Sequence, residues 1–436
     1  MRNLLHLFVA SLIIINCEAQ TVLTSSATAT PLSVASSPEA VGISSERLKR
    51  IDIALNELIK QDKLPGMVAL FTRNGQIVYQ KAFGYADVQT KRLMKTDDIF
   101  RIASMSKAIT STAVMMLYEE GKFSLDDPIS KFIPEFKNPR VIKSFKFSDT
   151  TYTTEAAKSE ITIRHLLTHT SGLGYGVIDG DESFKAMYKK AGIVDLYTTK
   201  NVKISDNIKK LAKLPLHFNP GEKFSYSEGL DVLGYFIEII SGMPFDEFLR
   251  THLFEPLGMN DTYFYLPDSK KDRMVYVQKP DSIQKWVRYP VTFYDPNYPI
   301  SGAKTFFSGG AGLSSTAKDY ATFLQMLLNG GAMSGKRFLS RTTVDLLTAT
   351  NQTGELFGGP KGDAFFSLGF SVVNQNGNAK GIGSIGRFSW GGYFNTNYWA
   401  DPKEKIIMIL MKQTQAAPDG GSEGIFTRLI YQSIDD

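Results

Sequence analysis

The sequence contains one cysteine, five histidines and three tryptophans among 436 residues. A single cysteine cannot form a disulfide within the chain, so stability has to come from the burial of apolar side chains. The same count excludes a zinc site of the Cys₂His₂ type. The apolar segment at residues 4–15 is shorter than the about 20 residues that a membrane-spanning helix needs. We therefore expect no stable membrane insertion.

The N-terminus has the features of a secretory signal peptide. Arg2 supplies a positive charge, residues 4–15 are apolar, and Ala19 is the small residue that a signal peptidase reads. We expect residues 1–19 to be removed, so that Gln20 becomes the first residue of the mature chain. The protein is then exported, to the periplasm or to the extracellular space.

Cys17 offers one alternative to this cleavage. A lipoprotein would carry its lipid on this cysteine, but Asn16 stands where such motifs have Gly, Ala or Ser. Cleavage after Ala19 is therefore favoured over lipidation. It leaves no cysteine in the mature chain, which excludes a thiol enzyme.

The charges of the chain are mixed. There are 49 basic and 44 acidic residues, a formal net charge of +5, and neither sign gathers into runs. Nucleic acid binding needs basic residues concentrated on one face, so this mixture indicates a solvated surface and no nucleic acid partner. Hydrophobic residues at 43% and charged residues at 21% indicate an ordinary globular protein.

The first part of the chain predicts a helix followed by a hairpin. Residues 20–38 are rich in Ser, Thr and Ala and predict a flexible lead. Ser44 then caps a helical pattern whose apolar residues share one face as far as Leu58. Two apolar runs, 67–72 and 77–83, are joined by an Asn-Gly turn. That turn is a strong signal for an antiparallel hairpin.

Helical patterns fill the middle of the chain and strand patterns return near its end. The helical patterns are at 104–121, 163–168, 205–212, 230–241, 245–253 and 317–329, with a final helix from residue 425. The strand patterns are at 366–373, 387–390, 396–400 and 406–411. We expect long loops at residues 174–201 and 268–306, and we expect these loops to shape the substrate pocket.

This order of elements predicts an α+β fold. A mixed antiparallel sheet domain flanked by helices is interrupted by a mostly helical domain, and the active site is expected in the cleft between them. A single two-lobed domain is expected at residues 39–433. Its sheet lobe comprises approximately residues 39–103 and 300–433, and its helical lobe approximately residues 104–299.

Ser104 and Lys107 form an S-x-x-K motif at the start of a predicted helix. Residues three apart lie on the same helical face, so the hydroxyl and the ammonium point together. A serine hydroxyl is a poor nucleophile unless a base takes its proton, and a buried lysine can be that base. The helix N-terminus also favours the oxyanion formed during acylation. Because the motif alone is common by chance, its context decides.

That context resembles class C β-lactamases, penicillin-binding proteins and family VIII carboxylesterases. The matching segments, in chain order, are FRIASMSK at 100–107, GKFSLDDP at 121–128, IRHLLTHTSGL at 163–173, PGEKFSYS at 220–227 and GGAGL at 309–313. The resemblance covers nearly all of residues 39–433. It implies the β-lactamase-like fold and a serine hydrolase that forms an acyl-enzyme on Ser104, with no cofactor.

The resemblance also assigns roles outside the motif. Tyr226 occupies the position of the catalytic tyrosine, which passes a proton between nucleophile and leaving group. The strand Trp390-Gly391-Gly392 replaces the family's Lys-Thr-Gly and is expected to bind substrate. The backbone N–H groups of Ser104 and Tyr393 would form the oxyanion hole. Without the resemblance, Tyr226 would be a core tyrosine and the strand only a bulge beside a buried tryptophan.

Two positions depart from the β-lactamase pattern. Glu228 stands where an asparagine usually binds the acylamino side chain of the lactam, and it is a candidate substrate-binding residue. Trp390 stands in the segment that would supply a lysine for the lactam carboxylate. Both departures resemble family VIII carboxylesterases and related transesterases. We therefore expect a small-molecule ester or acyl compound as substrate.

Three alternatives stay open. The same nucleophile could cleave amides, as in a β-lactamase or a D-alanyl-D-alanine carboxypeptidase, or it could transfer an acyl group as a transesterase. A protein of another class would bind cell-wall peptides without turnover. Reaction with a fluorophosphonate probe separates that silent binding protein from the enzymes.

Two further motifs are expected to be structural. Ser422 lies in a G-x-S-x-G sequence, but that mechanism needs a histidine downstream and the last histidine is His252. His165 and His169 have the spacing of zinc ligands, but Leu166 replaces the glutamate of H-E-x-x-H. We predict a glycine-rich turn at Ser422, a packing or loop-tethering role for the histidine pair, and no metal site.

Overall fold

A computed structural model describes residues 31–194, 196–415 and 417–436. The expected signal peptide, and the lead as far as residue 30, lie outside these residues. Within them, no helix has both the length and the apolar character needed to cross a membrane.

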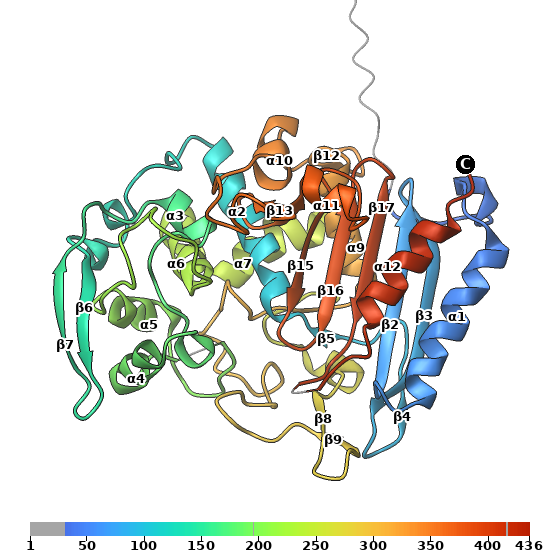
Figure 1. Cartoon of the computed structure of the whole chain (residues 1–436), viewed down its shortest axis with the longest axis horizontal. Coiled ribbons are helices and arrows are strands. Elements are labelled where there is room, and N and C mark those ends of the chain that lie inside the picture. The colour runs from blue at the N-terminus through green and yellow to red at the C-terminus, as the bar shows by residue number, and fades with distance from the viewer. Residues whose placement is uncertain (1–30, 195, 416) are drawn as a thin grey trace, which may run out of the picture.

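In the described part of the chain, nine strands form one mixed sheet in the order β1-β3-β2-β17-β16-β15-β14-β13, with β4 paired to β3 (Figure 1). Only β1 and β3 run parallel among these pairs. The strands are β1 (Ser33–Val34), β2 (Gly66–Arg73), β3 (Gln76–Asp87), β4 (Arg92–Leu93), β13 (Ala364–Phe366), β14 (Ser371–Val373), β15 (Phe388–Gly392), β16 (Thr396–Asp401) and β17 (Ile406–Met411). The hairpin predicted from the Asn-Gly turn is confirmed as β2 and β3.

Helices cover both faces of this sheet, and a mostly helical region extends from one side of it (Figure 1). The α-helices are α1 (Ser45–Lys60), α2 (Ser106–Glu119), α3 (Ile163–Leu167), α4 (Glu182–Ala191), α5 (Ile204–Leu211), α6 (Gly229–Ser241), α7 (Phe245–Leu249), α8 (Glu255–Leu257), α9 (Ala317–Leu328), α10 (Arg341–Thr348), α11 (Gln375–Ala379) and α12 (Ser422–Ser433). Short antiparallel pairs join β5 (Phe100–Arg101) to β10 (Ser314–Ser315), β6 (Arg140–Lys146) to β7 (Thr151–Ala156), β8 (Gln278–Pro280) to β9 (Trp286–Arg288) and β11 (Ala332–Met333) to β12 (Lys336–Arg337). The predicted α+β architecture is confirmed.

The apolar run in β2 is explained by a core on each face of the sheet. Side chains alternate between the two faces of a strand, so each face receives every second residue. Met67 and Phe71 pack in a cluster with residues of α1 and α12, whereas Val68 and Leu70 belong to the larger core that contains residues of α2 and α9. Both faces of β2 are buried, so its sequence is continuously apolar rather than alternating between apolar and polar residues.

Three segments differ from the sequence predictions. The strand expected at 366–373 is two strands, β13 and β14, because the chain turns back at Gly369, where φ is +118°. The expected loop at 174–201 contains α4. The expected loop at 268–306 contains the paired strands β8 and β9, and Gln278 forms an isolated β-bridge with Thr414.

Candidate active site

Ser104 lies in a tight turn between β5 and α2. The turn is a 3-10 helix, Ala103–Met105, that runs directly into α2. Ala103 has a φ of +47°, a left-handed conformation that costs a residue with a Cβ roughly 1–2 kcal/mol. The strained residue directly precedes Ser104, and such strain is often found where a side chain must be held for function.

Lys107 is buried with its amine beside this serine. Its side chain starts one turn after Ser104, and residues three apart in a 3-10 turn lie on the same side. Lys107 Nζ is 3.3 Å from Ser104 Oγ, 2.7 Å from the Gly310 carbonyl oxygen and 3.2 Å from the Tyr175 hydroxyl. Lys107 is only 2% exposed. The S-x-x-K motif thus brings a buried amine and a serine hydroxyl together.

Tyr175 was not predicted from the sequence as a site residue. Its backbone N–H donates to the Asp179 carboxylate at 2.7 Å, and the preceding N–H, of Gly174, donates to the Tyr188 hydroxyl at 2.9 Å. Burial raises the pKa of Tyr175 well above its ordinary value, with further contributions from Tyr226 and nearby carboxylates. The phenol beside Lys107 is therefore neutral. A sequence signal was present, because glycines flank this tyrosine directly after the segment at 163–173.

Tyr226 faces Lys107 with its ring. Lys107 Nζ lies 4.6 Å from the centroid of the Tyr226 ring, and the ring stacks on Tyr175 with a centroid separation of 5.3 Å. The Tyr226 hydroxyl accepts a hydrogen bond from Trp390 Nε1 at 3.4 Å. Among the hydrogen bonds of the described residues, none joins this hydroxyl to Ser104 or Lys107. The ring position fits the expected neighbourhood, whereas the hydroxyl is engaged elsewhere.

The two glycines of β15 let this strand approach the Ser104 turn. A Cβ on Gly392 would clash with the Ile102 carbonyl and with the Thr396 side chain. Thr396 Oγ1 also donates to the Ile102 carbonyl, at 3.4 Å. Tyr393 follows Gly392 directly, so its backbone N–H starts from the part of β15 that contacts the serine turn. The expected partners in the oxyanion hole therefore come from adjoining segments.

Glu228 and Asp231 are buried at the start of α6. Their exposed fractions are 2% and 4%. The Glu228 backbone N–H donates to the Gly174 carbonyl, at 3.1 Å, and Asp231 accepts from Gly310 N–H, at 3.4 Å. Glu228 was expected to contact substrate. That role stays a prediction, and Glu228 is also one of the groups that raise the pKa of Tyr175.

A buried arginine holds the long segment at 268–306 against the serine turn. Arg101 is 1% exposed and donates to the backbone carbonyls of Val275, Pro296 and Tyr298 at 2.9, 2.6 and 2.7 Å. A guanidinium with five donors can satisfy several carbonyls at once. This segment is therefore an ordered wall beside the site.

His165 and His169 have different structural roles. His165 Nδ1 accepts the Thr162 N–H in a capping box, whereas His169 lies beyond the end of α3 with a φ of +56°. Burial, with a smaller contribution from Lys107, holds the pKa of His169 well below its ordinary value. Its Nδ1 accepts the Ser227 N–H at 3.2 Å, which tethers two loops. Within the described residues, no group of three or more His, Cys, Asp or Glu side chains could hold a metal ion.

Ser422 is part of a buried polar cluster beyond the end of β17. It is the first residue of α12 and follows Gly420 and Gly421, whose φ values are +65° and +71°. Its hydroxyl accepts from Lys412 Nζ at 2.7 Å and donates to the Asp419 carboxylate at 2.8 Å. Ser422 and Lys412 are both fully buried. These bonds fasten α12 to the end of β17.

Comparisons with known proteins identify the family. A sequence profile of the Beta-lactamase family matches residues 51–432. Esterase EstB of Burkholderia gladioli is 30% identical over 385 residues, covering 84% of this chain and 90% of EstB. The structure of EstCE1, a hydrolase with promiscuous acyltransferase activity, is 26% identical with a TM-score of 0.72 over 88% of this chain and 98% of EstCE1. Simvastatin synthase (LovD) from Aspergillus terreus shares the fold, at 22% identity and a TM-score of 0.72, over 89% of this chain and 98% of LovD.

The profile match extends over most of the chain, and the similarity to EstB covers most of both proteins. The buried lysine beside a serine fits the chemistry of such enzymes. The chain therefore belongs to the β-lactamase family and is a serine hydrolase related to the family VIII esterases.

Proposed function

We propose that the protein hydrolyses small-molecule carboxylic esters through an acyl-enzyme on Ser104. The observation that carries this proposal is the 3.3 Å separation between Lys107 Nζ and Ser104 Oγ, with the amine buried. A nucleophilic serine needs a base within hydrogen-bond reach, and no other side chain of the described residues forms a hydrogen bond with Ser104 Oγ.

The three contacts of Lys107 fit a lysine that accepts a proton. A neutral amine has two N–H donors and one lone pair. The Gly310 carbonyl and the Tyr175 hydroxyl accept the two N–H groups, which leaves the lone pair for the Ser104 hydroxyl. As Ser104 Oγ attacks the ester carbonyl, its proton passes to Lys107.

Attack produces a tetrahedral intermediate whose oxyanion lies between the N–H groups of Ser104 and Tyr393. Such paired donors stabilise the charge that develops in the transition state. Collapse breaks the bond to the leaving alcohol, which takes the proton from Lys107 directly or through the Tyr226 phenol. Water then attacks the acyl-enzyme and gives a proton to the same base, which returns it to Ser104 Oγ as the carboxylic acid leaves.

The chemistry around Trp390 favours esters over lactams. A lactam presents a carboxylate, for which Trp390 offers no positive charge, and its indole N–H already donates to Tyr226. EstB is named an esterase, which agrees with this preference. Acyl transfer is a second candidate, because EstCE1 is described as having promiscuous acyltransferase activity and an alcohol can replace water at the deacylation step.

Two measurements test the reaction. A fluorophosphonate probe should label Ser104, with the modified peptide identified by mass spectrometry. A panel of p-nitrophenyl esters of increasing acyl length, run beside a chromogenic cephalosporin, should show ester turnover. Labelling at another residue, or the absence of labelling and turnover, contradicts the proposal.

We also propose that the protein is exported after cleavage behind Ala19. Mass spectrometry of the protein from its native cell should find Gln20 at the N-terminus, open or cyclised. A diacylglycerol on Cys17 would instead establish the lipoprotein alternative, and an uncleaved N-terminus would contradict export by this route.

A further inference from the structure

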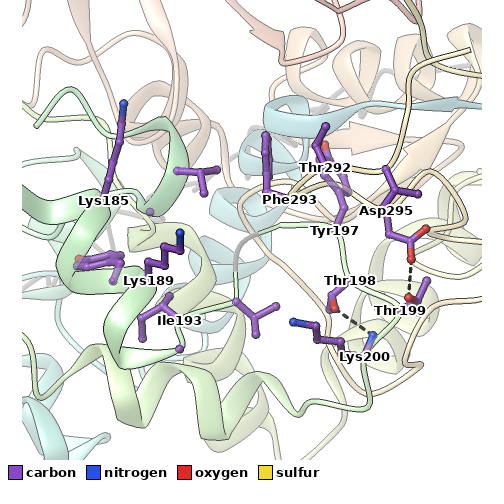
Figure 2. A pocket seen from close by; sticks show the side chains of 16 residues that line it. Lys185, Lys189, Ile193, Tyr197, Thr198, Thr199, Lys200, Thr292, Phe293 and Asp295 are labelled. Atoms are coloured by element: carbon purple, nitrogen blue, oxygen red, sulfur yellow. Dashed lines mark hydrogen bonds between the residues drawn. The ribbon is translucent and has the colours of Figure 1, made fainter. Parts of the chain in front are cut away.

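A cavity of about 400 Å³ is lined by residues of α4, of the ranges 192–194 and 197–200, and of the segment at 291–295 (Figure 2). We propose that this cavity binds an anionic group at the far end of the ester substrate. The inference rests on the proposed function, because it gives the substrate class of the same site: esters whose chain carries a terminal carboxylate or phosphate.

The cavity shares a wall with the proposed catalytic centre. Gly176 and Val177 line it and follow Tyr175 directly in the chain. Tyr197 also lines it and packs in the aromatic cluster that contains Ala103. On the other side, the Phe293 ring lies 6.0 Å from the Tyr393 ring. The cavity therefore borders residues next to Tyr175 and Tyr393, and the proposal places the far end of the substrate chain across this aromatic wall.

Two lysines supply positive charge to the cavity from facing sides. Figure 2 shows the Lys189 side chain, from α4, and the Lys200 side chain, from the following segment, directed into the space between them. Neither lysine forms an ion pair with another residue in the described ranges. Lys185, by contrast, is paired with Glu182 at 2.8 Å. Two unpaired ammonium groups on opposite walls attract an anion placed between them.

The remaining lining fits an apolar chain that ends in a charge. Ile193, Val194, Val291 and Phe293 supply apolar surface. Asp295 is the acidic residue among the described lining residues, and its carboxylate already accepts the Thr199 hydroxyl at 2.5 Å and the Asn297 N–H at 2.8 Å. The described lining residues thus include three lysines and one carboxylate, and their net charge is positive.

The test compares esters that differ only at the chain end. The kcat/KM values are measured for the p-nitrophenyl monoesters of adipic and suberic acid against p-nitrophenyl hexanoate and octanoate. At one of the two lengths, kcat/KM for the anionic ester should exceed that for the neutral ester by about 2- to 30-fold, the effect expected of two solvent-exposed ion pairs. Added salt should reduce this preference. The same chain ending in a phosphonate then distinguishes a phosphate site from a carboxylate site.

Two variants test whether the preference for anionic esters arises in the cavity. K189A/K200A should remove it while turnover of the neutral esters stays near wild type. Lys190→Ala is the matched control, because the neighbouring Lys190 donates to the Asp149 carbonyl and does not line the cavity. Equal kcat/KM for anionic and neutral esters at both lengths, or a preference that survives in K189A/K200A, overturns the proposal.

A binding measurement separates this proposal from the proposed function. If the wild-type protein hydrolyses no ester, the reaction has been misassigned, and the cavity is tested by calorimetry. The mono-anilide of adipic acid should bind Ser104→Ala protein more tightly than hexananilide does, and the difference should disappear when K189A/K200A is added. Equal affinities for the two anilides, or no binding of either, overturn the cavity assignment.

Discussion

Lys107 Nζ and the Tyr175 hydroxyl lie 3.2 Å apart, and the two residues are separated by 68 positions in the sequence. The phenol is neutral because burial raises its pKa, so it can orient the amine without competing for its proton. The contact joins the S-x-x-K helix to the helical region through an aromatic residue. It makes Tyr175 a positioning residue for the base.

Replacing Tyr175 by phenylalanine removes this acceptor and keeps the ring. Lys107 becomes an ammonium when it takes the serine proton, and a hydrogen bond to a charged group contributes about 1.5–3 kcal/mol, so kcat should fall by about 10- to 150-fold. Tyr294→Phe is the control, since the Tyr294 hydroxyl is buried without a hydrogen-bond partner in the described structure. The pH profile of kcat should also change in Tyr175→Phe alone. Wild-type kcat and an unchanged profile would show that Lys107 needs no such partner.

The nucleophile and base are tested by direct removal. Ser104→Ala should abolish acylation, and Lys107→Ala should lower kcat by at least about 10²-fold, the scale of general-base loss. Ser422→Ala should keep wild-type kcat per folded molecule, because its bonds to Lys412 and Asp419 fasten α12. It should lower the melting temperature instead. Burst kinetics measure acylation and kcat, and thermal unfolding measures the melting temperature of Ser422→Ala. Turnover by Ser104→Ala would refute the mechanism.

Gly392 and Gly391 form a matched pair in β15. A Cβ on Gly392 would clash with the Ile102 carbonyl, whereas a Cβ on Gly391 would lie 3.1 Å from the Thr396 carbonyl and 3.3 Å from the Asn397 amide. Gly392→Ala should therefore push β15 away from the serine turn. The loss of one oxyanion donor costs about 10²- to 10³-fold in kcat. Gly391→Ala should lose far less, and equal losses in the two variants would argue against the oxyanion role of Tyr393.

Asp319 predicts a pH dependence of stability. Burial raises its pKa from 3.8 to about 6, against the hydrogen bonds from Asp261 N–H and Thr262. Because the folded state binds the proton more tightly, this carboxyl stabilises the fold fully below pH 3.8 and loses that contribution as the pH rises through about 6. The loss is at most about 3 kcal/mol.

Asp319→Asn should remove this dependence. The melting temperature of the variant minus that of wild type should be larger at about pH 8 than at about pH 4. At the lower pH, wild-type Asp319 is mostly protonated. Asp272→Asn, at an exposed position, should show no such difference. Thermal unfolding at the two pH values measures it, and parallel curves for wild type and Asp319→Asn would contradict the assignment.

Local patterns predicted the parts of this fold that depend on few neighbouring residues. The Asn-Gly turn located β2 and β3, and the spacing of Ser104 and Lys107 placed two groups that lie one turn apart. The Gly310 carbonyl, by contrast, accepts a hydrogen bond from Lys107 although the two residues are 203 positions apart. No periodicity in the sequence predicts such a contact. Contacts of this kind depend on how the helical region packs against the sheet.

Two further features of the structure were missed for different reasons. The helix α4 was expected as loop although Asp181 caps its start and Gly192 its end. Its ten residues give a pattern of only a few apolar positions, which is weak against a flanking sequence rich in loop residues. The Tyr226 ring lies beside Lys107, and its hydroxyl accepts a hydrogen bond from Trp390. The tryptophan is itself a departure from the β-lactamase pattern, so the resemblance could not supply that bond.

The choice between esters and lactams depends on Trp390 and Glu228. A lactam presents a carboxylate and an acylamino group, which a lactamase site meets with a cation and an amide. Here the first position holds an aromatic ring whose N–H donates to Tyr226, and the second holds a buried acid. Each missing hydrogen bond to a charged group is worth about 1.5–3 kcal/mol, so two could cost about 10²- to 10⁴-fold.

We therefore predict that kcat/KM for a short-chain p-nitrophenyl ester exceeds that for nitrocefin by at least about 10²-fold. The double change Glu228→Asn with Trp390→Lys restores a cation and an amide, and it should narrow this ratio by at least about tenfold, one restored interaction. Trp390→Phe, which keeps an aromatic ring, should leave the ratio near that of wild type. If wild-type protein cleaves nitrocefin as fast as the ester, the esterase proposal fails and lactam hydrolysis takes its place. Ser104 and Lys107 would keep their roles, because both reactions pass through the same acyl-enzyme.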